Sequence, residues 1–414
     1  MSPVLPLQLA IQPQRLNHHL AELAQIGRLP EGGVRRIAYG PEDHLARQQV
    51  RQWMQTAGMQ VTIDAAGNLI GTYPGRIPSL PALATGSHID TVPSGGRYDG
   101  ALGVLAGIEV VQTLQDHNMH LNHPIHVIVF TDEEGGMIGS KALSGGIYTD
   151  PEHYRRPDGT SIQTCLAQIG GNWEQIRSAR RTRQDIAAFV ELHVEQGGSL
   201  DQQGIPIGIV EGIVGMRRSR IQITGRPNHA GTTPMHLRQD ALVAAAQVIL
   251  TAHDLALQTA GDQVATVGMC QVWPNASNIV PGRVELSLDL RDLSAQHLDQ
   301  LQNRFGQTLQ AIETQSGCTV KWIPVLQVDP ALAAPGIQQA IAAACTELGL
   351  SYRALPSRAG HDAQEMARFT DMGMIFVPSQ GGISHAEDEY TSPDQCAYGA
   401  DILLQTLMKL DKSY

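Results

Sequence analysis

The sequence predicts an α/β protein in which a larger α/β domain is interrupted by a smaller α+β domain. Apolar runs that end in polar residues alternate with Ala- and Leu-rich segments, which is the strand, helix, strand order of an α/β sheet. From about Gly215 the pattern changes to long alternating strands around two helices. The 414 residues also exceed what one hydrophobic core usually organises. We therefore expect one domain at residues 1–213 and 328–414 and a second at residues 214–327.

The elements of the larger domain follow from periodicity and turn residues. Helical segments occupy the chain before about residue 55, and VTIDAAGNLIGTYPG alternates around Asn and Gly, which indicates a hairpin. Buried strands are predicted for three apolar runs, PALATGSHID, HPIHVIVFTDEEGG and AAFVELHV, with the helix YDGALGVLAGIEVVQTLQ between the first two. After residue 328, PGIQQAIAAACTEL predicts a helix and MGMIFVPSQGG a strand, before a final helix.

The smaller domain has a βαββαβ-like order. RRSRIQITGRPNHAG alternates as a strand and QDALVAAAQVILTAHDLA is helical. QVATVGMCQVWPN, RVELSLDLRD, another helix and CTVKWIPVLQ follow. Such an order is typical of a self-contained α+β unit.

Charge and cysteine content limit the classes of protein and partner. The chain has 40 acidic and 29 basic residues without a Lys/Arg run, so we expect no nucleic-acid partner. Its 5 cysteines are never paired as CxxC, which argues against a disulfide framework and favours a reducing, cytoplasmic location. The N-terminal segment lacks the pattern of a signal peptide, and apolar runs elsewhere are interrupted by Gln, Asp or Gly. A soluble protein with no membrane contact is expected.

The segment TGSHIDTVPSGGRYDG places His88, Asp90 and Asp99 around a strand end and a helix start. Imidazole and carboxylate groups suit a borderline divalent metal, and strand alternation would keep His88 and Asp90 on one face, where Asp90 can orient the imidazole. Taken singly, a loop histidine and a helix N-cap are the more common explanations. Ligands of open α/β sheets collect at the carboxyl ends of strands, which favours a metal site.

Glu133 and Glu134 follow the next apolar strand. Burying two uncompensated negative charges is costly, and a bound cation would account for them; a solvated acidic turn is the alternative. Because adjacent strand residues point to opposite faces, we expect one carboxylate to bind metal and the other to act as general base.

Two more histidines stand beside strand ends and Gly-rich turns: His193 in ELHVEQG and His385 in SQGGISHAEDE. A lone histidine is more often structural than a ligand, and this chain has 16. Their assignment as ligands therefore depends on the other candidate ligands in the chain.

A set of segments carries a family resemblance: GSHIDTV, GGRYDGALGV, DEEG, ELHVEQG, GRPNHAGTTPM, NASNIVPG, LDLRD, AGHDA and PSQGGISHAEDE. In this order, from about residue 85 to 392, they resemble the amidase/hydantoinase-carbamoylase branch of the M20 metallopeptidase superfamily. That branch includes N-carbamoyl-L-amino acid hydrolases, β-ureidopropionases and allantoate amidohydrolases. The resemblance implies a zinc-peptidase-like catalytic domain, an inserted lid that forms a homodimer, and two divalent metal ions.

The resemblance also implies roles for the residues already singled out. Asp99 would bridge the two metals, with His88 and His193 on one and Glu134 and His385 on the other. Glu133 would be the general base, which moves a proton from water to the leaving nitrogen. Zn, Mn, Co and Ni all suit this ligand set.

Further residues are implied to surround the substrate. His229 in HAGTTPM would stabilise the oxyanion, reaching an active site across the dimer. Asn278 and Arg291 match a substrate clamp, in which an Arg fork suits a carboxylate; a turn residue and a surface charge are the plain alternatives. Gln196 would read a ureido group, and His361 in AGHDA would complete the pocket.

Two departures from the family pattern bear on the substrate. Many relatives carry an Arg-Phe pair and a longer segment after Glu-Glu-Gly, whereas this chain reads EEGGMIGSKALSG. AGHDA is preceded by Ser357 and Arg358, where many relatives have a small residue at the second position. One wall of the pocket is therefore expected to be short and differently lined.

The resemblance leaves several functions to weigh. The expected reaction is hydrolysis of the carbamoyl C–N bond of an N-carbamoyl-L-amino acid. Allantoate or another ureide is the nearest alternative, because it presents the same ureido and carboxylate groups. HVEQG and HAGTTPM disfavour a dipeptidase or aminoacylase. A non-catalytic binding protein on the same fold is disfavoured because the ligand and base positions all hold suitable residues.

Overall fold

The structure, a computed structural model, describes residues 9–156 and 158–414. The chain divides into two compact units. The first, which we call the large unit, comprises Met1–Gly212 and Leu332–Tyr414, and the second, the inserted unit, comprises Ile213–Ala331. The sequence analysis placed the insertion at residues 214–327. Both units combine helices with sheets, and the predicted α/β fold class is confirmed.

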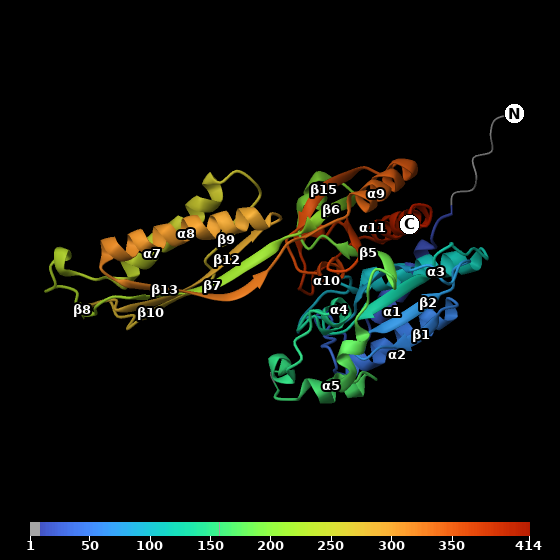
Figure 1. Cartoon of the computed structure of the whole chain (residues 1–414), viewed down its shortest axis with the longest axis horizontal. Helices are drawn as coiled ribbons and strands as arrows, with labels where there is room; N and C mark the ends of the chain where they lie inside the picture. Colours follow the sequence, from blue (N-terminus) through green and yellow to red (C-terminus); the bar gives the residue numbers. More distant parts are fainter. Residues whose placement is uncertain (1–8, 157) are drawn as a thin grey trace. The chain divides into compact units, whose positions relative to one another are not determined.

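A nine-stranded sheet in the order β1-β2-β4-β3-β5-β16-β6-β14, with β15 paired to β6, forms the centre of the large unit (Figure 1). Its strands are β1 (Gln60–Ile63), β2 (Leu69–Tyr73), β3 (Ala82–His88), β4 (Ile125–Phe130), β5 (Ile186–Val194), β6 (Ile207–Ile213), β14 (Ala331–Leu332), β15 (Tyr352–Ser357) and β16 (Asp371–Val377). β1 and β2 form the antiparallel hairpin, whereas β4, β3, β5 and β16 run parallel. Parallel strands are covered on both faces, and every residue of β3 and β5 is buried.

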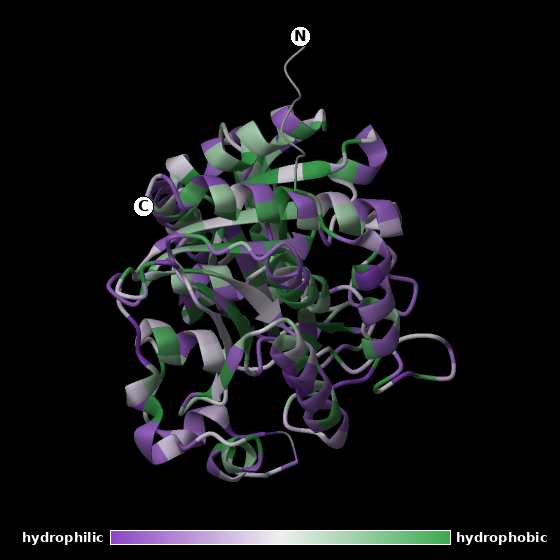
Figure 2. Cartoon of the chain, turned by 90° about the vertical axis from the view of Figure 1, so that its right-hand side faces the viewer, coloured by the Kyte–Doolittle hydropathy of each residue, from purple (hydrophilic) through white to green (hydrophobic). Residues whose placement is uncertain are grey.

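Helices pack around this sheet and share one hydrophobic core with it. They are α1 (Pro13–Leu23), α2 (Pro41–Thr56), α3 (Ala101–Asp116), α9 (Pro335–Leu348) and α11 (Pro393–Leu410). α3 is apolar on nearly all sides and is correspondingly buried, whereas α11 begins with a capping box between Ser392 and Gln395. Figure 2 shows hydrophobic residues along the central strands and hydrophilic residues on the outer helix faces.

Short helices occupy the loops of the large unit. They are α4 (Ile138–Ser144), η1 (Pro151–Tyr154), α5 (Ile162–Gln168), η2 (Trp173–Ala179), α6 (Ser199–Gln203), α10 (Asp362–Met366) and η4 (Gln380–Gly382). α4, α5 and η2 contribute to a smaller hydrophobic cluster. Because β3, β4, β5 and β16 run parallel, the loops that follow them emerge at the same edge of the sheet. These loops position the candidate site.

The inserted unit has a five-stranded sheet, in the order β10-β12-β7-β13 with β9 paired to β12, and a two-stranded sheet of β8 and β11. Its elements are β7 (Gly215–Thr224), β8 (Asn228–His229), η3 (Met235–Leu237), α7 (Ala241–Gln258), β9 (Val264–Thr266), β10 (Cys270–Trp273), β11 (Ile279–Val280), β12 (Arg283–Asp292), α8 (Ala295–Ser316) and β13 (Thr319–Val328). Alternate residues of β7 are buried and share a core with both helices. The segment QVATVGMCQVWPN, predicted as one strand, forms two because the chain leaves the sheet around Gly268.

α7 is the one helix of the described chain that is long and apolar enough to cross a membrane by length and composition alone. Part of this apolar character belongs to a buried face, formed by Ala241, Ala244, Ala245, Val248 and Ala252. The rest lies on exposed positions, which include Leu242, Val243, Leu250 and Leu257. No such segment was predicted from the sequence, because Gln and Asp interrupt the run.

Candidate metal centre and active site

The predicted metal ligands lie together at the carboxyl edge of the large sheet. They line a cavity of about 290 Å³ together with residues of neighbouring segments. The complete lining is His88, Asp99, Glu133, Glu134, Gly135, Gly136, Met137, Lys141, His193, Gln196, Ala359, Gly360, His361 and His385. His88 ends β3, His193 lies in β5, and Asp99 immediately precedes the N-cap of α3. The fold therefore joins residues that are up to 297 positions apart, from His88 to His385.

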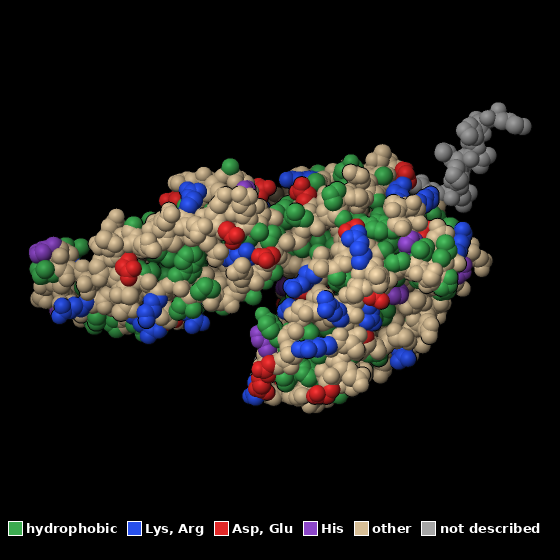
Figure 3. All heavy atoms as spheres, in the orientation of Figure 1, with side chains coloured by type: hydrophobic (Ala, Val, Ile, Leu, Met, Phe, Trp, Pro, Cys, Tyr) green, Lys and Arg blue, Asp and Glu red, His purple; other side chains and the backbone are tan. Residues whose placement is uncertain are grey.

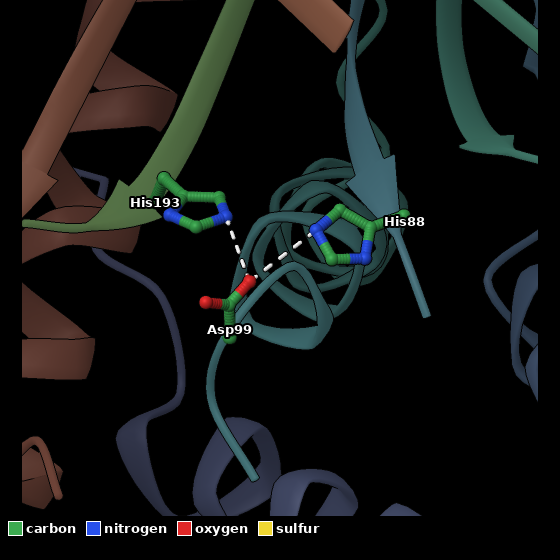
Figure 4. A group of neighbouring side chains, drawn as sticks. All are labelled: His88, Asp99 and His193. Atoms are coloured by element: carbon green, nitrogen blue, oxygen red, sulfur yellow. Dashed lines mark ion pairs between the residues drawn. The ribbon is translucent and has the colours of Figure 1, made fainter. Parts of the chain in front are cut away.

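Asp99 is the centre of the cluster. Its Oδ1 lies 3.3 Å from Nε2 of His88 and 3.3 Å from Nε2 of His193 (Figure 4). Its Oδ2 lies 3.3 Å from Nε2 of His385. The two oxygens of one carboxylate thus face two different sets of imidazoles, which is the arrangement that a bridging ligand requires.

The donor atoms fit a pair of divalent ions. Two groups, His88 with Asp99 and His193, and Asp99 with Glu134 and His385, each have ligand atoms within 4.8 Å of one another. Such spacing suits one ion at about 2.0–2.2 Å from each donor. Asp99 belongs to both groups. Two further groups join His88 to Glu133 and Glu134, and His193 to Glu191 and His361. The ligand division that the family resemblance implied therefore stays a prediction.

Backbone carbonyls orient two of the imidazoles. Nδ1 of His88 lies 3.0 Å from the carbonyl oxygen of Asp90, and Nδ1 of His193 lies 2.9 Å from that of Val194. A carbonyl oxygen only accepts, so Nδ1 carries a proton in both rings, and Nε2, which faces Asp99, is the nitrogen that can bind a metal once its own proton has left. This is the tautomer that a metal ligand needs.

Asp90 acts on the site by a different route from the predicted one. β3 ends at His88, so strand alternation does not extend to Asp90, and its carboxylate approaches Nδ1 of His88 only to 3.9 Å. The two carboxylate oxygens instead accept hydrogen bonds from the backbone N–H groups of Glu133, at 3.4 Å, and Glu134, at 3.2 Å. Asp90 therefore fixes the turn that carries both glutamates.

Glu133 and Glu134 lie in a turn, because β4 ends at Phe130 and Asp132 adopts a φ of 60°. Their side chains approach different histidines: Oε2 of Glu133 lies 3.7 Å from Nε2 of His88, and Oε1 of Glu134 lies 3.5 Å from Nε2 of His385. Burial raises the pKa of both carboxyls, with His88 opposing the shift. The two carboxylates thus contact different histidines, although both lie near His88.

The histidines and Asp99 shift one another's pKa values. Although burial opposes it, the histidines, His193 foremost, hold the pKa of Asp99 well below its usual range. The hydrogen bond from His385 to Asp99 raises the pKa of His385 to about 9. His385 therefore carries a proton at neutral pH in the metal-free protein, and a bound cation must displace it.

Glu389 and Ser384 support Asp99 and were missed by the sequence analysis. Oε1 of Glu389 accepts hydrogen bonds from the backbone N–H groups of Tyr98, at 2.9 Å, and Asp99, at 3.0 Å. The hydroxyl of Ser384 lies 3.0 Å from Oδ2 of Asp99. Both residues lie in the segment PSQGGISHAEDE, which carried the family resemblance. The sequence motif thus included them, but it did not indicate that they contact Asp99.

Gln196 and His361 also line the cavity. The side-chain amide of Gln196 donates to Oδ2 of Asp99 at 2.8 Å, whereas its buried Oε1 has no hydrogen-bond partner in the described chain. Nε2 of His361 lies 2.8 Å from the hydroxyl of Ser357. Burial, with His193 nearby, holds the pKa of His361 well below its usual range, so the ring is neutral.

His229, Asn278 and Arg291 belong to the inserted unit, whereas the residues that line the cavity all belong to the large unit. His229 is exposed on β8, and its Nδ1 accepts the backbone N–H groups of Gly231, at 3.0 Å, and Thr232, at 3.2 Å. The ring proton is therefore on Nε2, and the described residues provide no acceptor for it. Asn278 adjoins this strand, since its carbonyl accepts the N–H of Ala230 at 2.9 Å.

Arg291 lies at the other end of the inserted sheet. Its guanidinium contacts both carboxylate oxygens of Asp289, at 3.0 and 3.3 Å. β12 begins at Arg283, just after β11, and reaches Arg291 as its ninth residue. At about 3.3 Å per residue this places Arg291 roughly 26 Å along the strand from Arg283.

These features define an α/β protein with candidate metal-ligand groups at its sheet edge. The chain belongs to Peptidase family M20/M25/M40, whose model matches residues 84–409. The family predicted from the sequence motifs is thereby confirmed. Members of this family typically depend on two metal ions, which agrees with the paired ligand groups.

Three comparisons narrow the resemblance. The chain is 41% identical to an N-carbamoyl-L-amino acid amidohydrolase of Geobacillus stearothermophilus, over 97% of this chain and 99% of the relative. It is 35% identical to an allantoate amidohydrolase of Bacillus subtilis, over 95% of this chain and 97% of the relative. A solved structure of a hydantoinase/carbamoylase family amidase from Burkholderia multivorans matches with a TM-score of 0.89 and 35% identity, covering 97% of this chain and 98% of that one.

We expect Gly100→Ala to weaken metal binding about 10- to 100-fold, because the added methyl group would displace the ring of His88, a proposed ligand. Gly100 has a φ of +63°, and an added Cβ would lie 2.5 Å from the His88 ring. Calorimetric titration with Mn²⁺ measures the effect. Gly336→Ala is the matched control, because a Cβ there meets nothing within 4 Å. Equal Mn²⁺ affinities in the two variants would contradict the proposed packing of Gly100 on His88.

Proposed function

We propose that this chain is a metal-dependent amidohydrolase that cleaves the carbamoyl C–N bond of an N-carbamoyl-L-amino acid. The observation that carries the proposal is the shared Asp99, whose two oxygens face separate imidazole groups beside the partly buried Glu133. The relatives named for N-carbamoyl-L-amino acid and allantoate hydrolysis support a ureido substrate. The products would be the amino acid, ammonia and carbon dioxide.

We propose that each of the two ligand groups that share Asp99 holds one metal ion. His88 and His193 would hold one ion, Glu134 and His385 the other, and Asp99 both. Such a pair of ions polarises a carbonyl and lowers the pKa of water. Zn, Mn, Co and Ni remain the proposed candidates, because His and carboxylate donors suit each of them.

Glu133 is proposed to move the proton. Its carboxylate lines the cavity but lies outside the two groups that share Asp99. Burial raises its pKa, which makes it a better proton acceptor than an exposed glutamate. It would take a proton from the attacking water and pass it to the leaving nitrogen.

Polar groups of both units are proposed to recognise the substrate. The unpartnered Oε1 of Gln196 can accept an N–H of the ureido group, and neutral His361 adds a second polar wall. His229, with its proton on Nε2, would donate to the developing oxyanion. Asn278 and Arg291 would clamp the substrate carboxylate.

A substrate panel tests the proposed activity. Ammonia release would be measured from N-carbamoyl-L-amino acids, β-ureidopropionate, allantoate and dipeptides, each with Mn²⁺, Co²⁺, Ni²⁺ or Zn²⁺. Turnover of the N-carbamoyl-L-amino acids above the other compounds is expected. Preferential turnover of allantoate would replace the substrate but keep the reaction, whereas no ureide turnover with any metal would refute both.

Glu133→Gln is expected to retain two ions but lose nearly all turnover, because the amide cannot accept the proton. The loss should lie in kcat and reach at least about 100-fold, the lower range for a general base. Glu211→Gln is the control, since Glu211 is exposed on β6 and outside the cavity. Elemental analysis and steady-state rates provide the readouts. Comparable kcat in Glu133→Gln and the wild type would exclude Glu133 as the base.

A homodimer through the inserted unit is proposed on geometric grounds. His229 and Asn278 lie around β8, whereas Arg291 is near the far end of β12, so one inserted unit cannot bring all three to one small substrate. Two copies can, if Arg291 of one and His229 of the other meet at the same site. Exposed hydrophobic residues of α7, among them Leu242, Val243 and Leu250, provide apolar surface for such a contact, and Figure 3 shows hydrophobic side chains on the visible face of this unit.

Mixing two inactive variants tests the shared site. His229→Ala and Arg291→Ala are expected to regain roughly a quarter of the wild-type rate when unfolded and refolded together, because half of the randomly formed dimers hold one intact site. His229→Ala mixed with Asn278→Ala is the control and should stay inactive, since both changes affect the same end of the inserted unit. Equal rates from the two mixtures would contradict the dimer.

A cytoplasmic location with a small-molecule substrate completes the proposal. All five cysteines are free, and four of them are buried. Free thiols persist in a reducing compartment.

A further inference from the structure

Lys141 stands on the wall of the metal cavity that the sequence predicted to be short. Only Gly136 and Met137 separate Gly135 from the first residue of α4, so this helix begins directly after the glutamate turn. Lys141 lies in α4 and lines the same cavity as the metal ligands. It is the one Lys or Arg side chain among the described residues that line this cavity.

The ammonium group of Lys141 has donors to spare. Nζ donates to the carbonyl oxygen of Gly136 at 2.8 Å, and the described residues provide it with no ion pair. An ammonium has three N–H donors, so two are left for water or a ligand. The side chain is partly buried, which lowers its pKa, while Glu365, Asp132 and Glu133 oppose the shift and favour the charged form.

The wall beside Lys141 is nearly free of side chains. Gly135, Gly136, Ala359 and Gly360 contribute almost no bulk to the cavity lining, and Met137 contributes an apolar surface. The cavity of about 290 Å³ is small, so a ligand whose ureido group reaches the ligands of the metal centre brings its other groups to this wall. A cation with free donors on a wall that has few side chains favours a ligand with an acceptor at this position.

We propose that Lys141 binds an anionic group on the side chain of the substrate, so that this enzyme prefers ureides of acidic amino acids over those of apolar amino acids of similar size. This inference rests on the proposed amidohydrolase function. The α-carboxylate is left to Arg291 and Asn278, which the two copies of the proposed dimer would supply. Lys141 thus determines specificity through the second carboxylate of the substrate.

Lys141→Met tests the proposal, because it keeps the length of the side chain and removes the charge. The substrates are N-carbamoyl-L-aspartate and N-carbamoyl-L-leucine, whose side chains are similar in shape. Loss of a hydrogen bond to a charged group should lower the ratio of their kcat/KM values about 10- to 100-fold, through KM for the aspartate compound. Lys141→Arg should keep much of the preference. Lys412→Met, at an exposed lysine of the C-terminal turn, is the control.

An equal loss of kcat on both substrates, with their ratio unchanged, would overturn the proposal and leave Lys141 as a positioning residue for the Gly136 turn. Binding without turnover separates this failure from failure of the proposed function. Succinate and butyrate are titrated calorimetrically into the Mn²⁺-loaded wild type and Lys141→Met. Tighter binding of succinate in the wild type alone supports the role of Lys141 even if no ureide is hydrolysed. An equal succinate preference in both proteins refutes it.

Discussion

The site depends on one buried carboxylate that faces three imidazoles. Asp99 is 6% exposed, and each of its oxygens lies 3.3 Å from at least one histidine nitrogen. Burying an isolated carboxylate is unfavourable, so the surrounding positive charge, whether protons on histidines or bound metal ions, is a condition for this arrangement. Glu389 and Ser384 then fix the position of Asp99 by hydrogen bonds to its backbone and side chain. The remaining features of the centre follow from this constraint.

The sheet converts distant sequence positions into neighbours. His88 and His193 lie at the ends of β3 and β5, and Glu134 and His385 follow β4 and β16. These four strands are parallel, so the residues meet at one edge although they come from all parts of the large unit. The same edge receives the start of α3, where Gly100 has no Cβ and allows the His88 ring to approach. Rigid strands therefore carry His88 and His193, whereas loops carry His385 and the carboxylates. That division suits a site whose donor atoms must hold fixed positions.

Much of this architecture could be predicted from sequence because apolar strands that end in His, Asp or Glu are informative. The ligand groups around His88, Asp99 and Glu134 followed from spacing and charge, whereas His193 and His385 needed the family resemblance. The contact of Asp90 with the glutamate turn was missed, because strand alternation was assumed to continue beyond His88. Lys141 was missed because its part in the cavity arises from a short loop, and its distance from the ligands cannot be read from the sequence alone.

Asp99 as a shared ligand is the claim that most directly supports a two-metal amidohydrolase. Anomalous diffraction from crystals of the Mn²⁺-loaded protein tests it. The account predicts two peaks about 3.5–4 Å apart, one beside each oxygen of Asp99. A single peak, or two peaks of which only one contacts Asp99, would contradict it.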